Sequence, residues 1–162
     1  MTNKLASLGK KVPNFKLPAT GEQEIGLADL QDKYVVLYFY PKDSTPGCTR
    51  EGQDFRDNLT KFKRQKAVVL GVSRDSIKAH ENFKSKQGFN FELLSDQDEV
   101  LCRIFDVIKE KNMYGKKLMG IERSTFIIDP KGVLRHEWRK VKVDGHVEEV
   151  LTTLKQLVKE AS

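Results

Sequence analysis

The stretch YVVLYFYPKDSTPGC, residues Tyr34–Cys48, decides the fold, because an apolar run changes abruptly into a polar loop and then a helix start. Its first part, Tyr34–Tyr40, is continuously aliphatic or aromatic, which is typical of a strand buried on both faces. Thr45 followed by Pro46 predicts a helix with a hydroxyl N-cap and a proline at its first position. Cys48 is therefore expected in the first helical turn, beyond the end of a central strand.

The helix that follows predicts the direction of the Cys48 thiol. Five residues at helical spacing form one stripe that faces the sheet: Cys48, Gly52, Phe55, Leu59 and Phe62. The thiol should then point into a pocket at the edge of the sheet where α/β folds place their sites, and a helix N-terminus stabilises a reactive thiolate. A cysteine that merely fills the core is the alternative, but Pro41, Thr45 and the helix start favour the reactive one. Glu51 is interpreted as a structural residue that suits the helix dipole.

The order of the expected elements indicates an α/β fold with a central mixed β-sheet flanked by helices. Further elements are an N-terminal β-hairpin (15–17 and 24–26), a helical turn (27–30), strands at 67–73, 91–94, 121–128 and 133–138, and helices at 46–65, 75–87, 96–105 and 146–160. Lys109–Gly120 is polar, contains two glycines and is expected to be a mobile loop.

Length and composition indicate the class of protein. The 162 residues are expected to form a single domain, residues 1–162. Hydrophobic residues make up 38% and charged residues 32%, the balance of an ordinary soluble protein, and no apolar run is long enough to cross a membrane. The first residues lack the apolar segment of a signal peptide, and two cysteines make no disulfide framework. We expect a cytoplasmic protein that does not bind membranes.

The basic charge and the histidines do not indicate a nucleic-acid or metal site. The net charge is +6, with lysine clusters at Lys61–Lys66 and Lys109–Lys117, but 23 acidic residues are interspersed, which favours a solvated surface over nucleic-acid binding. The histidines His80, His136 and His146 are scattered, and no Cys-x-x-Cys pair occurs. We expect no metal or other cofactor and no dithiol electron carrier.

Two motifs carry a resemblance to a known family. Pro41-x-x-x-Thr45-x-x-Cys48 resembles the active-site signature of the peroxiredoxins, thiol peroxidases on a thioredoxin-like fold. The string CTREGQDFRD, Cys48–Asp57, is similar to the bacterioferritin-comigratory, or Q-type, subfamily. A second string, RSTFIIDP, Arg123–Pro130, resembles the strand that supplies the active-site arginine of the family. The resemblance covers the chain from Gly9 onward and implies a thioredoxin-like fold here.

The resemblance implies roles for four residues. Cys48 is the peroxidatic nucleophile, and Arg123 stabilises its thiolate and binds a peroxide oxygen. The Thr45 hydroxyl holds the substrate oxygen, and Pro41 shapes the pocket and shields the thiolate from water. From the residues alone, Arg123 lies on an inward strand face and needs an anionic partner, although an arginine that extends to solvent is the alternative.

The chain departs from the Q-type pattern at the resolving cysteine. Many members carry that cysteine five residues after the peroxidatic one, where this chain has Gln53, and others carry it within residues 76–88, where no cysteine occurs. The remaining thiol, Cys102, flanks an apolar stripe and is interpreted as a core residue, with a resolving role as the alternative. We expect a one-cysteine enzyme.

The sequence therefore predicts a thiol-dependent peroxidase for hydrogen peroxide and organic hydroperoxides, acting in antioxidant defence. Cys48 becomes a sulfenic acid and is restored by an external thiol such as thioredoxin, glutaredoxin or a small thiol. The protein is expected to be a monomer or weak dimer. The alternative function is a redox sensor or chaperone-like module that uses the same cysteine without turnover.

Overall fold

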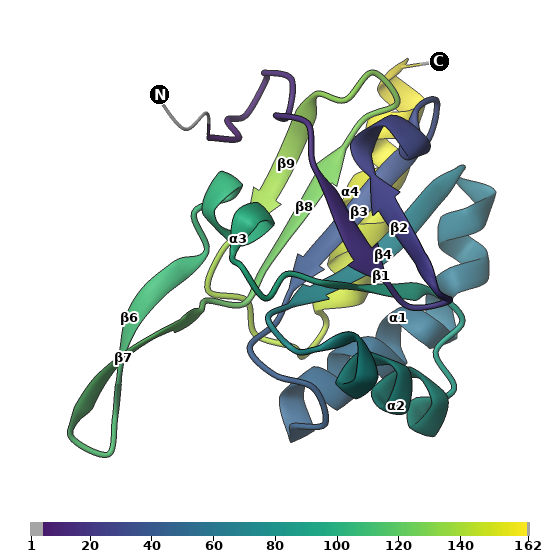
Figure 1. Ribbon diagram of the computed structural model, residues 1–162. Coiled ribbons are helices and arrows are strands. Elements are labelled where there is room, and N and C mark those ends of the chain that lie inside the picture. Colours follow the sequence, from purple (N-terminus) through teal and green to yellow (C-terminus); the bar gives the residue numbers. More distant parts are fainter. Residues whose placement is uncertain (1–4, 162) are drawn as a thin grey trace.

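The computed structural model describes residues 5–161, apart from the side chain of residue 113, and its centre is a mixed seven-stranded sheet (Figure 1). The strand order is β2-β1-β5-β4-β3-β8-β9. These strands are β1 (Lys16–Ala19), β2 (Gln23–Gly26), β3 (Tyr34–Phe39), β4 (Ala67–Ser73), β5 (Glu92–Ser95), β8 (Ser124–Ile128) and β9 (Leu134–Trp138). Strands β3, β4 and β5 are parallel, and the other pairings are antiparallel. The predicted α/β class, mixed sheet and N-terminal hairpin are confirmed.

Helices and a short 3₁₀ turn accompany the sheet. They are η1 (Leu27–Leu30), α1 (Pro46–Arg64), α2 (Ile77–Gln87), α3 (Val100–Ile104) and α4 (His146–Ala161). Helix α2 begins after Ser76, whose hydroxyl accepts a hydrogen bond from the Ala79 amide, and ends at Gly88 in the left-handed conformation. Helix α3 has five residues, so the predicted helix over 96–105 is too long. Among the described residues, no helix has the length and hydrophobicity needed to span a bilayer.

The central sheet separates two hydrophobic cores. Every residue of β3 is buried, and alternate side chains belong to different clusters because successive side chains of a strand point to opposite faces. Val36 and Tyr38 pack with α1 and α4, whereas Leu37 and Phe39 pack with the N-terminal segment and α3. In Figure 1, α4 lies behind the sheet and α3 in front of it. The continuous hydrophobicity of β3 is therefore explained by cover on both faces.

The segment predicted to be a mobile loop is a protruding β-ribbon (Figure 1). Strands β6 (Ile108–Met113) and β7 (Lys116–Ile121) pair antiparallel as a separate two-stranded sheet. Between them, Tyr114 and Gly115 both have positive φ, 53° and 76°, as a tight two-residue hairpin turn requires. The loop prediction was wrong because it counted polar residues and glycines and overlooked this turn.

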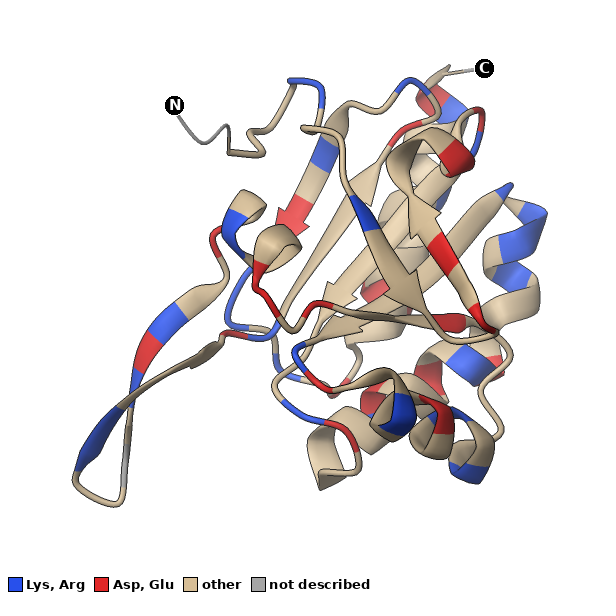
Figure 2. Ribbon diagram, viewed as in Figure 1, with Lys and Arg blue, Asp and Glu red and all other residues tan. Residues whose placement is uncertain are grey.

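The ribbon carries four lysines, Lys109, Lys111, Lys116 and Lys117, with one acidic residue, Glu110, among them. Figure 2 shows basic positions on the ribbon, with acidic colour between them, and further basic positions at the far end of α1. Lys109 Nζ lies 3.2 Å from Asp106 Oδ2, and Lys117 Nζ lies 3.7 Å from Glu110 Oε1. These exposed pairs contribute little stability, but they partly neutralise the lysine cluster that the sequence places here.

Candidate active site

Cys48 occupies the third position of α1, immediately beyond the carboxyl end of β3. The buried side of α1 consists of Cys48, Glu51, Gly52, Phe55, Leu59 and Phe62. The predicted stripe is therefore confirmed, with Glu51 as an addition. Gly52 leaves room for the ring of Phe89, because a Cβ at this position would lie 2.3 Å from the ring. Cys48 is only 2% exposed, so its thiol is buried at a helix N-terminus.

Arg123 faces this thiol from another part of the chain. Its Nη2 lies 3.4 Å from Cys48 Sγ, within hydrogen-bond distance for sulfur. Strand β8 pairs antiparallel with β3, and Ser124 lies opposite Phe39, so the residue before Ser124 reaches the start of α1. Gly47 gives the guanidinium space, since a Cβ there would lie 3.1 Å from Nη2. The sheet register therefore places the cation over the sulfur.

The predicted location of Arg123 on a strand was wrong. Strand β7 ends at Ile121 and β8 begins at Ser124, so the predicted single strand over 121–128 is divided. Arg123 lies in the two-residue link, where its backbone carbonyl accepts a hydrogen bond from Val141. The Arg123 side chain contacts Cys48 and the Glu51 carboxylate, and the solvent-reaching alternative is excluded because the side chain is only 16% exposed.

Glu51 is the residue that the sequence interpretation undervalued. Its carboxylate is completely buried, and Oε1 accepts a hydrogen bond of 2.6 Å from Arg123 Nη1. Its spacing of three residues from Cys48 places both groups on one side of α1, which is the signal that could have revealed this role. Burial raises the pKa of Glu51 to about 7, although the Arg123 cation opposes that shift. Arg123 therefore lies between two acidic groups, one carboxyl and one thiol.

Thr45 and Pro41 lie on the loop that leads into α1. Thr45 is the N-cap residue, as predicted, with an extended backbone of φ −86° and ψ 155°. Its hydroxyl, however, makes no capping bond and instead donates to the Lys42 carbonyl at 2.8 Å. This bond leaves the hydroxyl lone pairs available to a donor. Pro41 is partly exposed and follows the end of β3.

Cys102 lies on the opposite side of the sheet from Cys48. It belongs to the hydrophobic cluster with Phe39 and Phe105, whereas Cys48 belongs to the cluster with Tyr38 and Phe55. Cys102 is fully buried, and burial, reinforced by the nearby Asp96 carboxylate, raises the pKa of its thiol well above the ordinary range. The structure therefore does not bring the two cysteines together, and both are free.

Comparison with known proteins places this geometry in a family. Residues 8–137 match the model of the AhpC/TSA family. Peroxiredoxin Bcp of Xanthomonas campestris is 52% identical over 160 residues, covering 99% of this chain and 100% of the relative, and Peroxiredoxin Bcp of Bacillus subtilis is 51% identical over 150 residues, covering 93% and 96%.

Solved structures agree with these relatives. A structure of Xanthomonas campestris Peroxiredoxin Q has a TM-score of 0.86 at 56% identity, covering 89% of this chain and 91% of that one. Another, of the bacterioferritin comigratory protein of the same organism, has a TM-score of 0.86 at 55% identity, covers 89% and 92%, and was described in connection with alkyl peroxide reduction activity. The likeness confirms the thioredoxin-like fold that the sequence resemblance implied.

The raised pKa of Glu51 predicts a pH-dependent contribution to stability. The unfolded chain releases this proton near pH 4.5, whereas the folded protein retains it up to about pH 7. Relative to Glu51→Gln, the free energy of unfolding of the Glu51 protein should therefore fall as pH rises from about 4.5 to 7, by a few kcal/mol at most, and change little above that.

The measurement is urea unfolding of both proteins between pH 4 and 8, in a Cys48→Ser background so that the thiol does not titrate. If ionised Glu51 were instead the form favoured by folding, its advantage over Glu51→Gln would grow as pH rises through about 4.5. That result would contradict the raised pKa of Glu51 in the folded protein.

Proposed function

We infer the catalytic residues from one premise: the chain belongs to the AhpC/TSA family, among the Bcp or Q-type peroxiredoxins, and is a thiol-dependent peroxidase. Cys48 is proposed as the peroxidatic nucleophile. The single observation that carries this proposal is the 3.4 Å contact between Arg123 Nη2 and Cys48 Sγ at a helix N-terminus. Both the cation and the unpaired amides of the first turn stabilise a thiolate over a thiol.

The proposed reaction begins with the attack of the Cys48 thiolate on the terminal peroxide oxygen. A sulfur–oxygen bond forms, the oxygen–oxygen bond breaks, and the departing oxygen takes a proton to leave as water or an alcohol. Sulfur is oxidised to a sulfenic acid and the peroxide is reduced. Arg123 is assigned to the charge that develops on the two oxygens, and the free lone pairs of Thr45 Oγ1 accept a hydrogen bond from the peroxide. Pro41 forms part of the pocket wall.

The proposed substrates are hydrogen peroxide and organic hydroperoxides. The second class is supported by the Xanthomonas campestris relative described for alkyl peroxide reduction. For turnover, a thiol such as thioredoxin, glutaredoxin or a small thiol attacks the sulfenic sulfur and releases water, and a second thiol then reduces the mixed disulfide. We further propose a cytoplasmic, monomeric or weakly dimeric protein, in keeping with the free thiols of both cysteines.

The assignment of Cys48 predicts that Cys48→Ser abolishes peroxide consumption while leaving the fold intact, because a hydroxyl is a poor nucleophile at neutral pH. Peroxide consumption with an excess of a thiol reductant is the measurement, and circular dichroism checks the fold. Cys102→Ser is the matched control and should keep wild-type activity. Peroxide turnover by Cys48→Ser would remove Cys48 from the mechanism. A wild-type protein that is oxidised once but never turns over would favour the sensor alternative.

The placement of Cys102 predicts that no internal disulfide forms. A disulfide needs Cα atoms within about 7 Å, whereas the two thiols lie in cores separated by the sheet. The sulfenic acid should therefore persist and, with excess peroxide, proceed to the sulfinic acid. Intact mass spectrometry after one and after many equivalents of peroxide distinguishes these products. A Cys48–Cys102 bond in the peptide map, or a Cys102→Ser variant that stalls after one turnover, would make Cys102 the resolving residue.

A further inference from the structure

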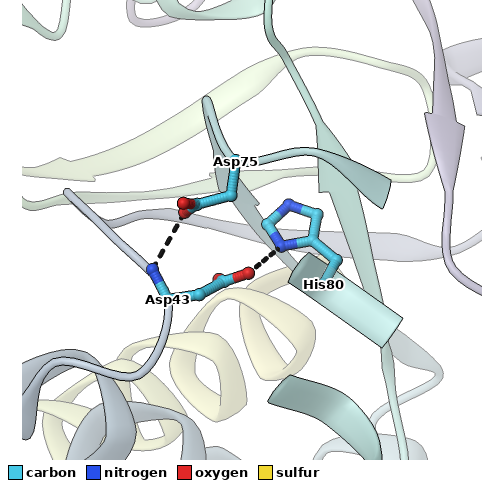
Figure 3. Close-up of side chains that lie close together, drawn as sticks. All are labelled: Asp43, Asp75 and His80. Carbon is cyan, nitrogen blue, oxygen red and sulfur yellow. Dashed lines mark hydrogen bonds and ion pairs between the residues drawn. The ribbon is translucent and has the colours of Figure 1, made fainter. Parts of the chain in front are cut away.

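A buried polar network holds the loop that precedes Cys48 (Figure 3). His80 of α2 is completely buried, and its Nδ1 lies 2.7 Å from Asp43 Oδ2. The other oxygen of Asp43 accepts a hydrogen bond of 2.6 Å from the Tyr40 hydroxyl. The Asp43 amide donates to Asp75 Oδ2 at 2.9 Å, before the start of α2. The loop residue Asp43 is thus bonded to the residue that follows β3, to α2 and to the segment before α2.

The network requires one proton between His80 and Asp43. His80 Nε2 lies 2.9 Å from the Leu94 carbonyl, which can only accept, so Nε2 carries a hydrogen. The 2.7 Å contact of Nδ1 with Asp43 also needs a hydrogen, carried by either group. Without it, two acceptors would face each other in a dry site, at high cost. The pair is therefore a fully satisfied, directional link.

A metal ion is a weaker interpretation of this cluster. Ligand atoms of Asp43, Asp75 and His80 lie within 4.8 Å of one another. Asp75 Oδ2, however, already accepts hydrogen bonds from Ser73 Oγ at 2.6 Å and from the Asp43 amide. Nδ1 of His80 and Oδ2 of Asp43 are bonded directly to each other. A cation would have to break these bonds, so we assign the cluster to hydrogen bonding.

The linked loop is strained and leads directly to the reactive cysteine. Ser44, next to Asp43, has φ 63°, a conformation that costs free energy for a residue other than glycine. On its other side, Thr45 is braced by its bond to the Lys42 carbonyl. Ser44 itself is exposed, so packing of its own side chain does not hold this conformation. The hydrogen bonds of its neighbours Asp43 and Thr45 hold the strained turn instead. The position of the Thr45 hydroxyl relative to Cys48 therefore depends on Asp43.

We propose that the buried Asp43–His80 pair, completed by Tyr40, is a positioning element that fixes Thr45 and the first turn of α1 for the reaction of Cys48 with peroxide. The inference rests on the proposed function of Cys48. These residues touch neither the sulfur nor the substrate in the proposed mechanism, and they act through the loop. Misplacement of a catalytic group by a small distance can cost about a hundredfold in rate, so the pair should matter for chemistry and not only for stability.

The test compares two rate constants in each variant: that of reduced protein with hydrogen peroxide in a single turnover, and that of Cys48 with iodoacetamide, which needs no hydroxyl from Thr45. Asp43→Ala should lower the peroxide constant about tenfold to a hundredfold, and more than it lowers the alkylation constant. The readout is therefore the ratio of the peroxide constant to the alkylation constant. Tyr40→Phe, which removes one hydroxyl and should fold normally, should lower this ratio by a smaller factor than Asp43→Ala does.

Asp43→Asn is the conservative variant that separates geometry from charge. Its amide can donate to neutral His80 and its oxygen can accept from Tyr40, so every bond of the network survives without the shared proton. The ratio of rate constants should remain within about threefold of wild type. Asp129→Ala is the control for general loss of stability, because Asp129 supports the β8–β9 turn through hydrogen bonds from the Lys131 and Val133 amides.

Three results would overturn the proposal: an unchanged ratio in both Asp43→Ala and Tyr40→Phe, a loss in Asp43→Asn as large as in Asp43→Ala, or an equal loss in Asp129→Ala. If Asp43→Ala does not fold, Tyr40→Phe and Asp43→Asn still decide the matter. A wild-type protein whose Cys48 does not react with peroxide would instead contradict the proposed function, independently of the network.

Discussion

The rest of the site depends on one partly buried cation placed between two acids. The guanidinium of Arg123 lies 3.4 Å from the Cys48 sulfur and 2.6 Å from a Glu51 oxygen. Two full negative charges on one partly buried cation are costly, so the protonation of one acid affects that of the other. Since burial raises the pKa of Glu51 to about 7, its neutral form is accessible at physiological pH, and Arg123 then has Cys48 as its one remaining acidic partner of the two. Glu51 therefore both orients Arg123 and competes with Cys48 for its charge.

The fold satisfies this constraint through sheet register and helix packing. Antiparallel pairing of β3 with β8 brings the residue before β8 to the carboxyl end of β3, and α1 begins at the same end with its buried side against the sheet. The β3–β8 pairing and the packing of α1 both depend on β3 as a central strand with side chains packed on its two faces, and all six of its residues are buried. The same division of the core into two clusters separates Cys48 from Cys102. One architectural feature thus brings Arg123 to Cys48 and keeps the other free thiol, Cys102, in the core on the opposite face of the sheet.

Local patterns predicted much of this arrangement, and long-range contacts account for the rest. The hydrophobic run at Tyr34–Tyr40 and the Thr45–Pro46 helix start predicted β3 and α1 almost to the residue. Arg123 was identified from a motif, but its place between two strands reflects the division of the chain between two sheets, with β7 in the ribbon and β8 in the central sheet. The roles of Glu51 and of the Asp43–His80 pair were not foreseen, because their partners lie 72 and 37 residues away in sequence. Hydrophobic periodicity carries no information about such polar partners.

The most direct test of the central claim removes the cation without leaving a buried charge unpaired. We would compare Glu51→Gln with the double variant Glu51→Gln/Arg123→Met, with Arg135→Met as an exposed control, and measure the rate of Cys48 alkylation against pH together with the rate of its reaction with hydrogen peroxide. Loss of Arg123 should slow alkylation at neutral pH, because fewer thiols are ionised, and slow the peroxide step about a hundredfold. If both rates are unchanged from those of Glu51→Gln at every pH, the cation does not stabilise the thiolate and the account is wrong.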